Sequence, residues 1–208
     1  MFSTVPPVRI VAGTARGRRI EAPEGRVTRP TLDRVRQAIF NALDARELVR
    51  NAVVLDLFGG SGALALEALS RGAANATVVE ADRAAVMFVR RNAEALGFAE
   101  VVRVIRSDVL RWLVDGGAIA LQPTLVLADP PYDWSSWPEL FASLPASVEC
   151  VVAETGVSLP APLGWEVERE KRYGGTIVTM LVPSPSQRAD ELSDAPPKSR
   201  ETELEVTQ

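Results

Sequence analysis

The chain has 208 residues, and its 47% hydrophobic content suffices for one packed core and excludes wholesale disorder. It contains no histidine and a single cysteine, Cys150, which excludes histidine-based triads, disulfide frameworks and the usual zinc sites. No apolar run approaches the ~20 residues needed to span a bilayer, and the N-terminus lacks the apolar segment of a signal peptide. We therefore expect a cytoplasmic protein that holds no metal, with Cys150 buried in a strand.

The formal net charge is −4, but the charges are unevenly distributed. Residues 1–50 carry ten arginines and only five acidic residues, whereas the rest of the chain has an acidic excess. This asymmetry indicates a face that meets a polyanion. The alternative is that arginine simply replaces lysine here, since Lys171 and Lys198 are the chain's only lysines.

The pattern predicts three regions with different organisation. Residues 1–48 form a basic extension, in which Val8–Ala12 and Arg18–Ala22 predict a hairpin and a helix begins near Leu32. Residues 49–183 form the main domain. Residues 184–208 have no aromatic residue and little apolar periodicity, and we expect this acidic tail to be disordered. The arginines that are candidates for phosphate contacts are Arg16, Arg18, Arg19, Arg29, Arg34 and Arg36.

In the main domain, short β-rich runs alternate with helical stretches. The expected strands are Ala52–Leu57, Ala76–Glu80, Val101–Arg106, Thr124–Ala128 and Val148–Ala153, and the expected helices include Ala63–Arg71, Arg83–Leu96 and Val109–Val114. This alternation predicts an α/β fold with a doubly wound, mostly parallel sheet. Trp165–Lys171 and Thr176–Val182 flank a glycine turn with no helix between them, so a seven-stranded sheet should end in an antiparallel hairpin.

A glycine-rich turn follows the first strand of the main domain. The segment 56–62 contains Asp56, Phe58, Gly60 and Gly62, and it leads into the first helix. In such sheets, ligands bind outside the carboxyl ends of the strands, and glycines let the backbone approach them. The turn lacks the GxGxxG spacing of a dinucleotide fingerprint, although Ala65 stands at its third position, and the chain has no P-loop motif.

Two further acids end the next strands and extend this candidate site. Glu80 ends the second strand, where a carboxylate can accept hydrogen bonds from both hydroxyls of a ribose. Asp108 follows the third strand, where it either accepts from an adenine amino group or caps the next helix. Together with Asp56, Gly60 and Gly62, this set resembles the S-adenosylmethionine site of Rossmann-like methyltransferases, with Phe58 in place of the first glycine of their motif.

The tetrapeptide Asp129-Pro130-Pro131-Tyr132 directly follows the apolar fourth strand. An ionised aspartate only accepts hydrogen bonds, which suits an exocyclic amine, and a tyrosine ring offers a face for stacking a base. If Asp129 and the Pro130 carbonyl hold both N–H groups, the amine nitrogen becomes pyramidal and its lone pair points at the methyl donor. The rate gain then comes from placement, which suits a chain without histidine.

The tetrapeptide resembles the signature of methyltransferases that act on the amino groups of adenine, guanine, cytosine or glutamine. The chain also resembles the bacterial 16S ribosomal RNA (guanine(966)-N(2))-methyltransferase family over about residues 8–182. Besides the tetrapeptide, the segments that carry this resemblance are Arg9–Gly13, Ala15–Ile20, Thr28–Arg36, Phe40-Asn41, Asp56–Ala73, Glu80, Asn92, Leu96-Gly97, Lys171 and Tyr173-Gly174. The resemblance implies a monomeric enzyme that uses S-adenosylmethionine to methylate 16S rRNA in an assembled or partly assembled 30S subunit. It also implies RNA recognition by residues 1–48 and methyl transfer by residues 49–183.

Two other functions remain open at this point. An adenine N6 methyltransferase that acts on DNA or RNA is the enzymatic alternative, because adenine also presents a flat ring with an exocyclic amine. An RNA-binding assembly factor with a vestigial cofactor fold is the non-enzymatic one. The intact Asp129 and glycine turn argue against the second, since a pure binder needs neither.

Overall fold

The computed structural model describes residues 8–22 and 30–185. The strands are β1 (Val8–Arg9), β2 (Arg19–Ile20), β3 (Val53–Leu57), β4 (Asn75–Glu80), β5 (Val102–Arg106), β6 (Leu125–Ala128), β7 (Cys150–Thr155), β8 (Trp165–Tyr173) and β9 (Thr176–Pro183). The α-helices are α1 (Pro30–Asp44), α2 (Ala63–Ser70), α3 (Arg83–Leu96), α4 (Val109–Val114) and α5 (Trp137–Ala142). None of the described helices is long and apolar enough to cross a bilayer. Nearly all of the acidic tail, and Arg29, lie outside the described residues.

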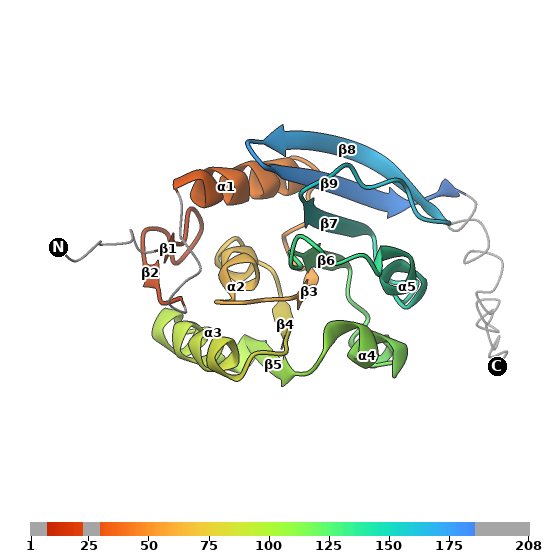
Figure 1. The fold of residues 1–208 in the computed structure, drawn as a ribbon. Coiled ribbons are helices and arrows are strands. Elements are labelled where there is room, and N and C mark those ends of the chain that lie inside the picture. The colour runs from red at the N-terminus through yellow and green to blue at the C-terminus, as the bar shows by residue number, and fades with distance from the viewer. Residues whose placement is uncertain (1–7, 23–29, 186–208) are drawn as a thin grey trace, which may run out of the picture.

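Seven strands form one sheet in the order β5-β4-β3-β6-β7-β9-β8 (Figure 1). The five strands from β5 to β7 are parallel, and β9 runs antiparallel to both β7 and β8. This confirms the predicted doubly wound sheet with a terminal antiparallel hairpin. The chain moves outward from β3 through β4 to β5 and then returns to place β6 on the other side of β3. The switch point, where such sheets bind ligands, therefore lies between β3 and β6.

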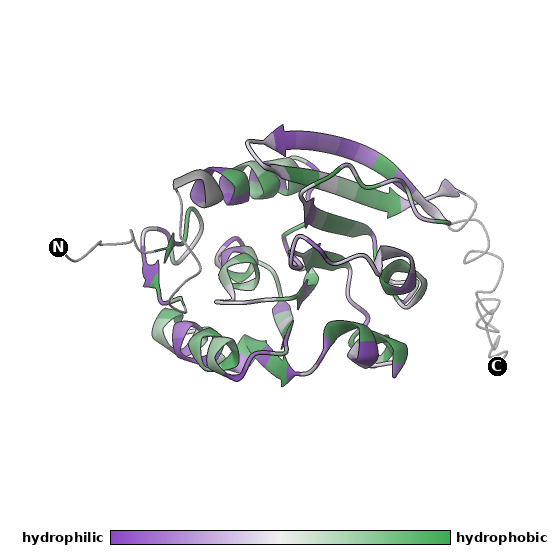
Figure 2. Cartoon of the chain, in the orientation of Figure 1, coloured by the Kyte–Doolittle hydropathy of each residue, from purple (hydrophilic) through white to green (hydrophobic). Residues whose placement is uncertain are grey.

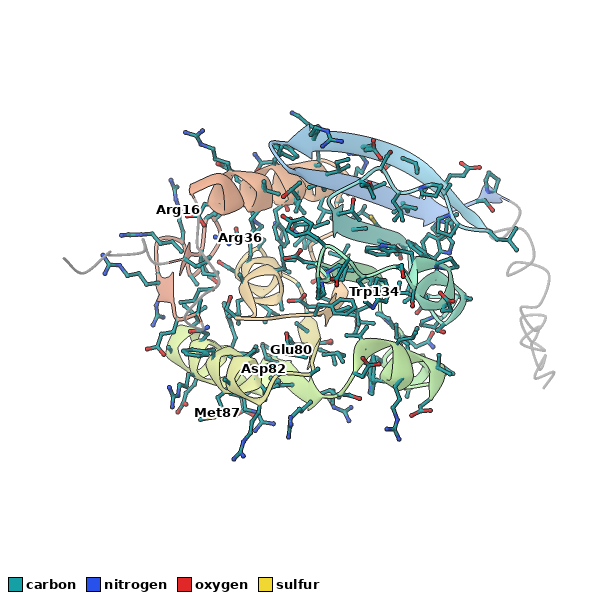
Figure 3. All side chains as sticks on the ribbon, in the orientation of Figure 1. Arg16, Arg36, Glu80, Asp82, Met87 and Trp134 are labelled. Atoms are coloured by element: carbon teal, nitrogen blue, oxygen red, sulfur yellow. The ribbon has the colours of Figure 1, made fainter. Side chains whose placement is uncertain are left out.

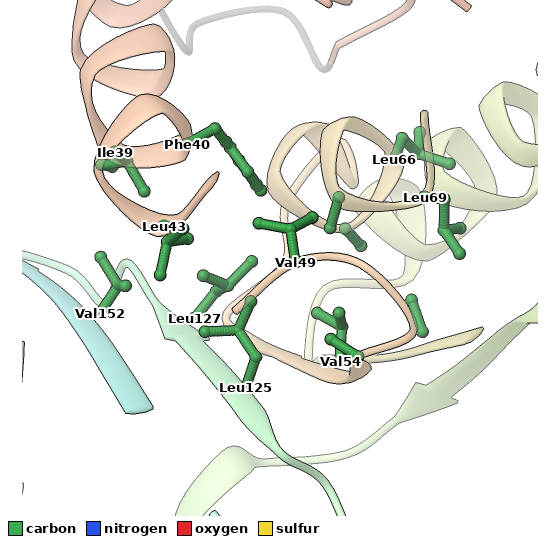
Figure 4. Packing of buried hydrophobic residues seen from close by; sticks show 14 of the residues in the cluster. Ile39, Phe40, Leu43, Val49, Val54, Leu66, Leu69, Leu125, Leu127 and Val152 are labelled. Atoms are coloured by element: carbon green, nitrogen blue, oxygen red, sulfur yellow. The ribbon is translucent and has the colours of Figure 1, made fainter. Parts of the chain in front are cut away.

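Helices cover both faces of the parallel part of the sheet, which explains its nearly continuous apolar strands. Along β6, Leu125 and Leu127 pack into the core shared with α1, α2 and α3, whereas Val126 and Ala128 pack into the core shared with α4 and α5. Figure 4 shows the first of these cores, with Phe40 and Leu43 of α1 over the sheet. The two cores fix the parallel strands β3, β4, β6 and β7, so that their carboxyl ends lie side by side.

The outer strand β8 carries mostly exposed polar and charged residues, while its neighbour β9 is largely apolar and buried (Figure 2). Charged side chains on an edge strand oppose pairing with another sheet. The sequence predicted the hairpin, but not that β9 would join β7 and leave β8 at the edge.

The basic extension forms the predicted hairpin, in which β1 and β2 are antiparallel. Its connecting loop is fixed to α2 by two buried side chains. The two carboxylate oxygens of Glu67 accept hydrogen bonds from the backbone N–H groups of Val11 at 2.7 Å and Ala12 at 3.0 Å. The Ser70 hydroxyl oxygen accepts a hydrogen bond from the Ala15 N–H at 2.9 Å. Gly13 has φ +80°, and an added Cβ would lie 1.7 Å from the Ser70 carbonyl oxygen. The close approach of this loop to α2 therefore requires glycine at position 13.

Candidate active site

The glycine turn after β3 adopts an uncommon backbone conformation. Phe58, Gly60 and Gly62 have φ angles of +63°, +56° and +80°, and the first of these is rare for a residue with a bulky side chain. The N–H of Phe58 donates to the Val79 carbonyl oxygen of β4 at 3.0 Å, and Gly62 begins helix α2. The turn is thus held against the neighbouring strand.

Asp56, near the end of β3, is almost completely buried, with 1% of its surface exposed. Its Oδ2 atom accepts a hydrogen bond from the Ala65 N–H at 3.0 Å, which ties the strand to the start of α2. The pKa of Asp56 is raised to about 7, mainly by burial; the Ala65 hydrogen bond lowers it, and the nearby carboxylates of Asp129 and Glu80 add to the increase. Asp56 therefore helps to fix the glycine turn, because it connects the strand before the turn with the helix after it.

Glu80, at the end of β4, joins two loops through its carboxylate. Oε2 accepts from the Gly60 N–H at 2.8 Å, and Oε1 accepts from the Asp82 N–H at 2.8 Å. Figure 3 shows Glu80 and Asp82 close together at this end of β4. Each carboxylate oxygen has a second lone-pair direction, so the same group can still accept from ligand hydroxyls.

Asp108 follows β5 and caps helix α4. Its side chain accepts from the Arg111 N–H at 2.9 Å, the bond expected of an N-cap aspartate. Of the two roles considered from the sequence, capping is therefore observed. The capping hydrogen bond involves Oδ1 of Asp108. A contact between the Asp108 carboxylate and a ligand stays a prediction.

The Asp129–Tyr132 loop leaves the sheet at the end of β6, beside the glycine turn. The Asp129 N–H points to the Leu57 carbonyl oxygen of β3 at 3.5 Å, and Asp129 is exposed. Pro130 is buried and Pro131 exposed, so the first proline anchors the loop. Tyr132 is 76% exposed, and its hydroxyl lies 3.3 Å from the Thr176 hydroxyl. The ring therefore has a face available for stacking.

Aromatic rings connect the glycine turn with the segment that follows this loop. The rings of Phe58 and Trp134 meet edge to face at 5.2 Å, and Trp134 meets Trp137 of α5 at 5.0 Å. Beside them lies a cavity of about 960 Å³, bordered by residues of the segments 130–144 and 154–164. The candidate catalytic loop thus borders a cavity large enough for a nucleobase.

The candidate phosphate-binding arginines fall into two groups. Arg16, Arg18, Arg19 and Arg34 are exposed, although the Arg18 guanidinium also donates to the Ala95 carbonyl at the end of α3. Arg36 differs, because it is 5% exposed, pairs with Asp33 at 2.9 Å and Glu67 at 3.5 Å, and donates to the Arg9 carbonyl. Figure 3 shows Arg36 inside the molecule and Arg16 at its outer side. These contacts indicate a structural role for Arg36, and its expected phosphate contact stays a prediction.

The sequence reasoning assigned no role to two buried polar residues at the site. Asn92 of α3 exchanges hydrogen bonds with the backbone of Glu21 and donates to the Ser61 carbonyl at 2.9 Å, which joins the extension to the glycine turn. Glu154 lies in β7 at the border of the cavity. Burial raises the pKa of Glu154 to about 8. Glu154 directly follows the apolar run Val148–Ala153, and an acid at the end of an apolar strand is the signal that identified Glu80. The same signal could therefore have identified Glu154.

No three His, Cys, Asp or Glu residues are grouped as a metal site within residues 8–22 and 30–185. Cys150 is buried in β7, as expected from the sequence, and burial raises the pKa of its thiol to about 12. This thiol therefore stays protonated at neutral pH and is unsuited to act as a nucleophile.

The chain is similar to several known proteins in sequence and in fold. A family model described as conserved hypothetical protein 95 matches residues 8–182. Ribosomal RNA small subunit methyltransferase D of Escherichia coli (strain K12) is 37% identical over 175 residues, covering 80% of this chain and 85% of that protein. The E. coli structure named "Putative methyltransferase yhhF" is 33% identical, with a TM-score of 0.72, and covers 86% of this chain and 99% of that one. SMU.776, complexed with SAH, is 14% identical with a TM-score of 0.53 over 67% of this chain and 49% of that one, which shows the fold alone.

Proposed function

Because this chain belongs to the ribosomal RNA small subunit methyltransferase D family, we propose that it transfers a methyl group from S-adenosylmethionine to N2 of a guanine in 16S rRNA. The observation that carries this proposal is the Asp129–Tyr132 loop, which leaves β6 next to the glycine turn and borders the cavity. An amine-binding loop and a cofactor turn thus share one edge of the sheet.

The residues around the turn fit the proposed cofactor. Glu80 is buried, and the N–H groups of Gly60 and Asp82 fix the orientation of its carboxylate. The carboxylate oxygens keep lone pairs that can accept from the two ribose hydroxyls. Gly60 and Gly62 keep the turn free of side chains where the backbone must approach a ligand. S-adenosylmethionine, when bound, supplies a methyl group on a positively charged sulfonium sulfur.

The chain's own residues then act on the base. The Asp129 carboxylate and the Pro130 carbonyl oxygen accept hydrogen bonds from the two N–H groups of the amine, which fixes its nitrogen and turns its lone pair out of conjugation with the ring. The proton that the nitrogen loses on methylation passes to the Asp129 carboxylate and then to solvent. Tyr132 stacks on the base, because its ring is largely exposed at the rim of the cavity. Catalysis in this scheme comes from orientation, which can contribute several orders of magnitude.

The RNA is proposed to lie along the basic extension. Arg16 and Arg19 are exposed on the hairpin region, which is hydrogen-bonded to α2 and α3, and Arg34 is exposed on α1. Such cations bind phosphates without reading sequence. We further propose that the substrate is the small ribosomal subunit, assembled or partly assembled, and that one copy of the chain acts as a monomer. The target base must leave its stack to reach Asp129.

Product analysis tests this function. Purified protein is incubated with labelled S-adenosylmethionine and small ribosomal subunits from cells lacking the activity, and the RNA is digested to nucleosides. We expect labelled N2-methylguanosine. Labelled N6-methyladenosine would instead support the adenine enzyme, and RNA binding without any label would support an assembly factor. A parallel reaction with protein-free 16S rRNA establishes whether the particle is required.

A further inference from the structure

Glu154 occupies the strand position next to the proposed catalytic carboxylate. In the register of β6 and β7, Ala128 lies opposite Ala153, so Asp129 and Glu154 follow at neighbouring positions of parallel strands. Residues at equivalent positions of adjacent strands project to the same face of a sheet. Glu154 is 9% exposed and borders the cavity together with Pro130, Pro131 and Tyr132. A base held by Asp129 therefore has Glu154 as its neighbour.

The surroundings of Glu154 determine its protonation state. Burial is the main cause that raises the pKa of this carboxyl to about 8, with further increases from the charges of Asp129 and Asp56. The buried guanidinium of Arg36 on α1 acts in the opposite direction but does not prevail. At pH 7 the group is therefore mainly the neutral acid, which has one O–H donor and one carbonyl acceptor.

We propose that Glu154 is a specificity-determining residue, which reads the edge of the target base beside the amino group that Asp129 accepts. This inference rests on the proposed function and adds the reason for its choice of base. When N2 of guanine lies at Asp129, the next groups along the ring edge are the N1–H donor and the O6 acceptor. The neutral carboxyl of Glu154 complements both, because its carbonyl accepts from N1–H and its hydroxyl donates to O6.

Adenine offers a poorer match to the same residue. With N6 at Asp129, the next ring atom is the N1 acceptor, which is followed by a C–H group. One of the two hydrogen-bonding atoms of Glu154 then has no polar partner, and an unsatisfied buried group is costly. A site built to satisfy polar groups discriminates strongly against an analogue that leaves them unpaired. The pair Asp129–Glu154 would thus favour guanine over adenine.

Two substitutions at this position test the inference with small ribosomal subunits from cells lacking the activity. Glu154→Gln keeps one donor and one acceptor but cannot ionise, so we expect kcat/KM for guanine methylation within a few-fold of wild type at pH 7. Glu154→Ala should lower kcat/KM by about tenfold to a hundredfold, the effect of losing two buried hydrogen bonds. Both variants should bind S-adenosylmethionine with unchanged affinity in calorimetry. Glu149→Gln, an exposed acid just before the same strand, is the matched control.

The pH profile separates base reading from a merely structural role. A carboxyl with a raised pKa is neutral below that pKa and ionised above it, so wild-type kcat/KM should fall as the pH rises from 7 to about 8.5. The Glu154→Gln enzyme should not show that fall. Asp56 titrates in both proteins, so their difference isolates Glu154.

The outcomes distinguish this inference from the proposed function. If the wild-type enzyme produces no N2-methylguanosine, the proposed function fails, and the base-reading role fails with it. If the wild type produces N2-methylguanosine, but folded Glu154→Ala and Glu154→Gln proteins match its kcat/KM and its pH profile, only the role of Glu154 is overturned. Should Glu154→Ala fail to fold in thermal scans, Glu154→Gln and its pH profile decide the question alone.

Discussion

The two halves of the candidate active site differ in how deeply their side chains are buried. On the glycine-turn side, Asp56 and Glu80 are buried, and both already accept backbone hydrogen bonds. On the side of β6, Asp129 and Tyr132 are exposed, and Pro130, Pro131 and Tyr132 border a large cavity. The first half is thus enclosed within the protein, whereas the second is exposed to solvent.

This difference suggests different tasks for the two halves. A preorganised half binds its ligand with little further ordering, which suits a cofactor used in every turnover. An open half suits a base that arrives on a large RNA and leaves after the reaction. Substitutions in the first half should therefore change cofactor affinity and folding, whereas those in the second should change turnover or base placement.

The largest expected effect comes from Asp129→Ala. The loss of the acceptor that orients the amine should lower kcat by about a hundredfold or more, because correct placement of the nitrogen supplies most of the rate. Cofactor affinity should stay within a few-fold of wild type, since the residue faces the base. Single-turnover methylation and calorimetry with S-adenosylmethionine measure the two quantities.

Asp133→Ala provides the matched control for this change, because Asp133 is an exposed acid of the same segment and has no proposed role. It should keep wild-type kcat. If Asp129→Ala retained most of its turnover, or lost cofactor affinity as strongly as kcat, the division between the two halves would be wrong.

Glu80→Ala should produce the opposite pattern. Losing a charged acceptor for two ribose hydroxyls should weaken cofactor binding by about 1.5–3 kcal/mol. The same change frees the N–H groups of Gly60 and Asp82, so a lower melting temperature should accompany it. Calorimetry and a thermal scan check both effects, with the exposed Glu94→Ala on α3 as control. Unchanged calorimetric affinity in a folded Glu80→Ala protein would contradict this cofactor assignment.

Tyr132 should show a smaller effect, confined to the base. Tyr132→Ala should raise KM for RNA by an amount equivalent to roughly 1–3 kcal/mol of stacking. Tyr132→Phe should keep most activity, because the ring stacks and the hydroxyl makes only one exposed hydrogen bond, with the Thr176 hydroxyl. Steady-state kinetics with small subunits measures both variants. Loss of activity in Tyr132→Phe would instead assign the role to the hydroxyl.

The sequence predicted most of the sheet because apolar strands buried on both faces leave a strong local signal. The predicted bounds of Arg83–Leu96 match those of α3, where Asp82 caps the first turn and Gly97 ends the helix. The order of β9 and β8 was not predictable in this way. A hairpin pattern identifies two paired strands, but the strand that joins the sheet is decided by packing against β7.

The arginines show the same limit within the site. Arg34 and Arg36 are two residues apart, so they lie on nearly opposite sides of α1, and one is exposed whereas the other is buried. The burial of Arg36 depends on Glu67, which comes from another helix. No local pattern reveals such a pairing. Glu154 is a different case, because its signal was present in the sequence and only its raised pKa and its place at the cavity made it prominent.

The smallest expected effects concern the exposed arginines, and Arg36 provides their contrast. If Arg16 and Arg19 contact phosphates, replacing either by alanine should reduce the log–log salt slope of RNA binding by roughly one unit or less. Neither change should alter cofactor affinity or the melting temperature, since exposed ion pairs contribute little to stability. Arg36→Ala should instead lower stability by about 1.5–3 kcal/mol, because the buried Glu67 carboxylate loses one of its two charge partners and keeps Arg71 at 2.8 Å. Binding titrations at several salt concentrations and denaturant unfolding separate the two effects. An unchanged salt slope in the Arg16→Ala, Arg19→Ala double variant would contradict a role of the hairpin in RNA recognition. An unchanged stability in Arg36→Ala would contradict the structural role of Arg36 and would favour its predicted phosphate contact instead.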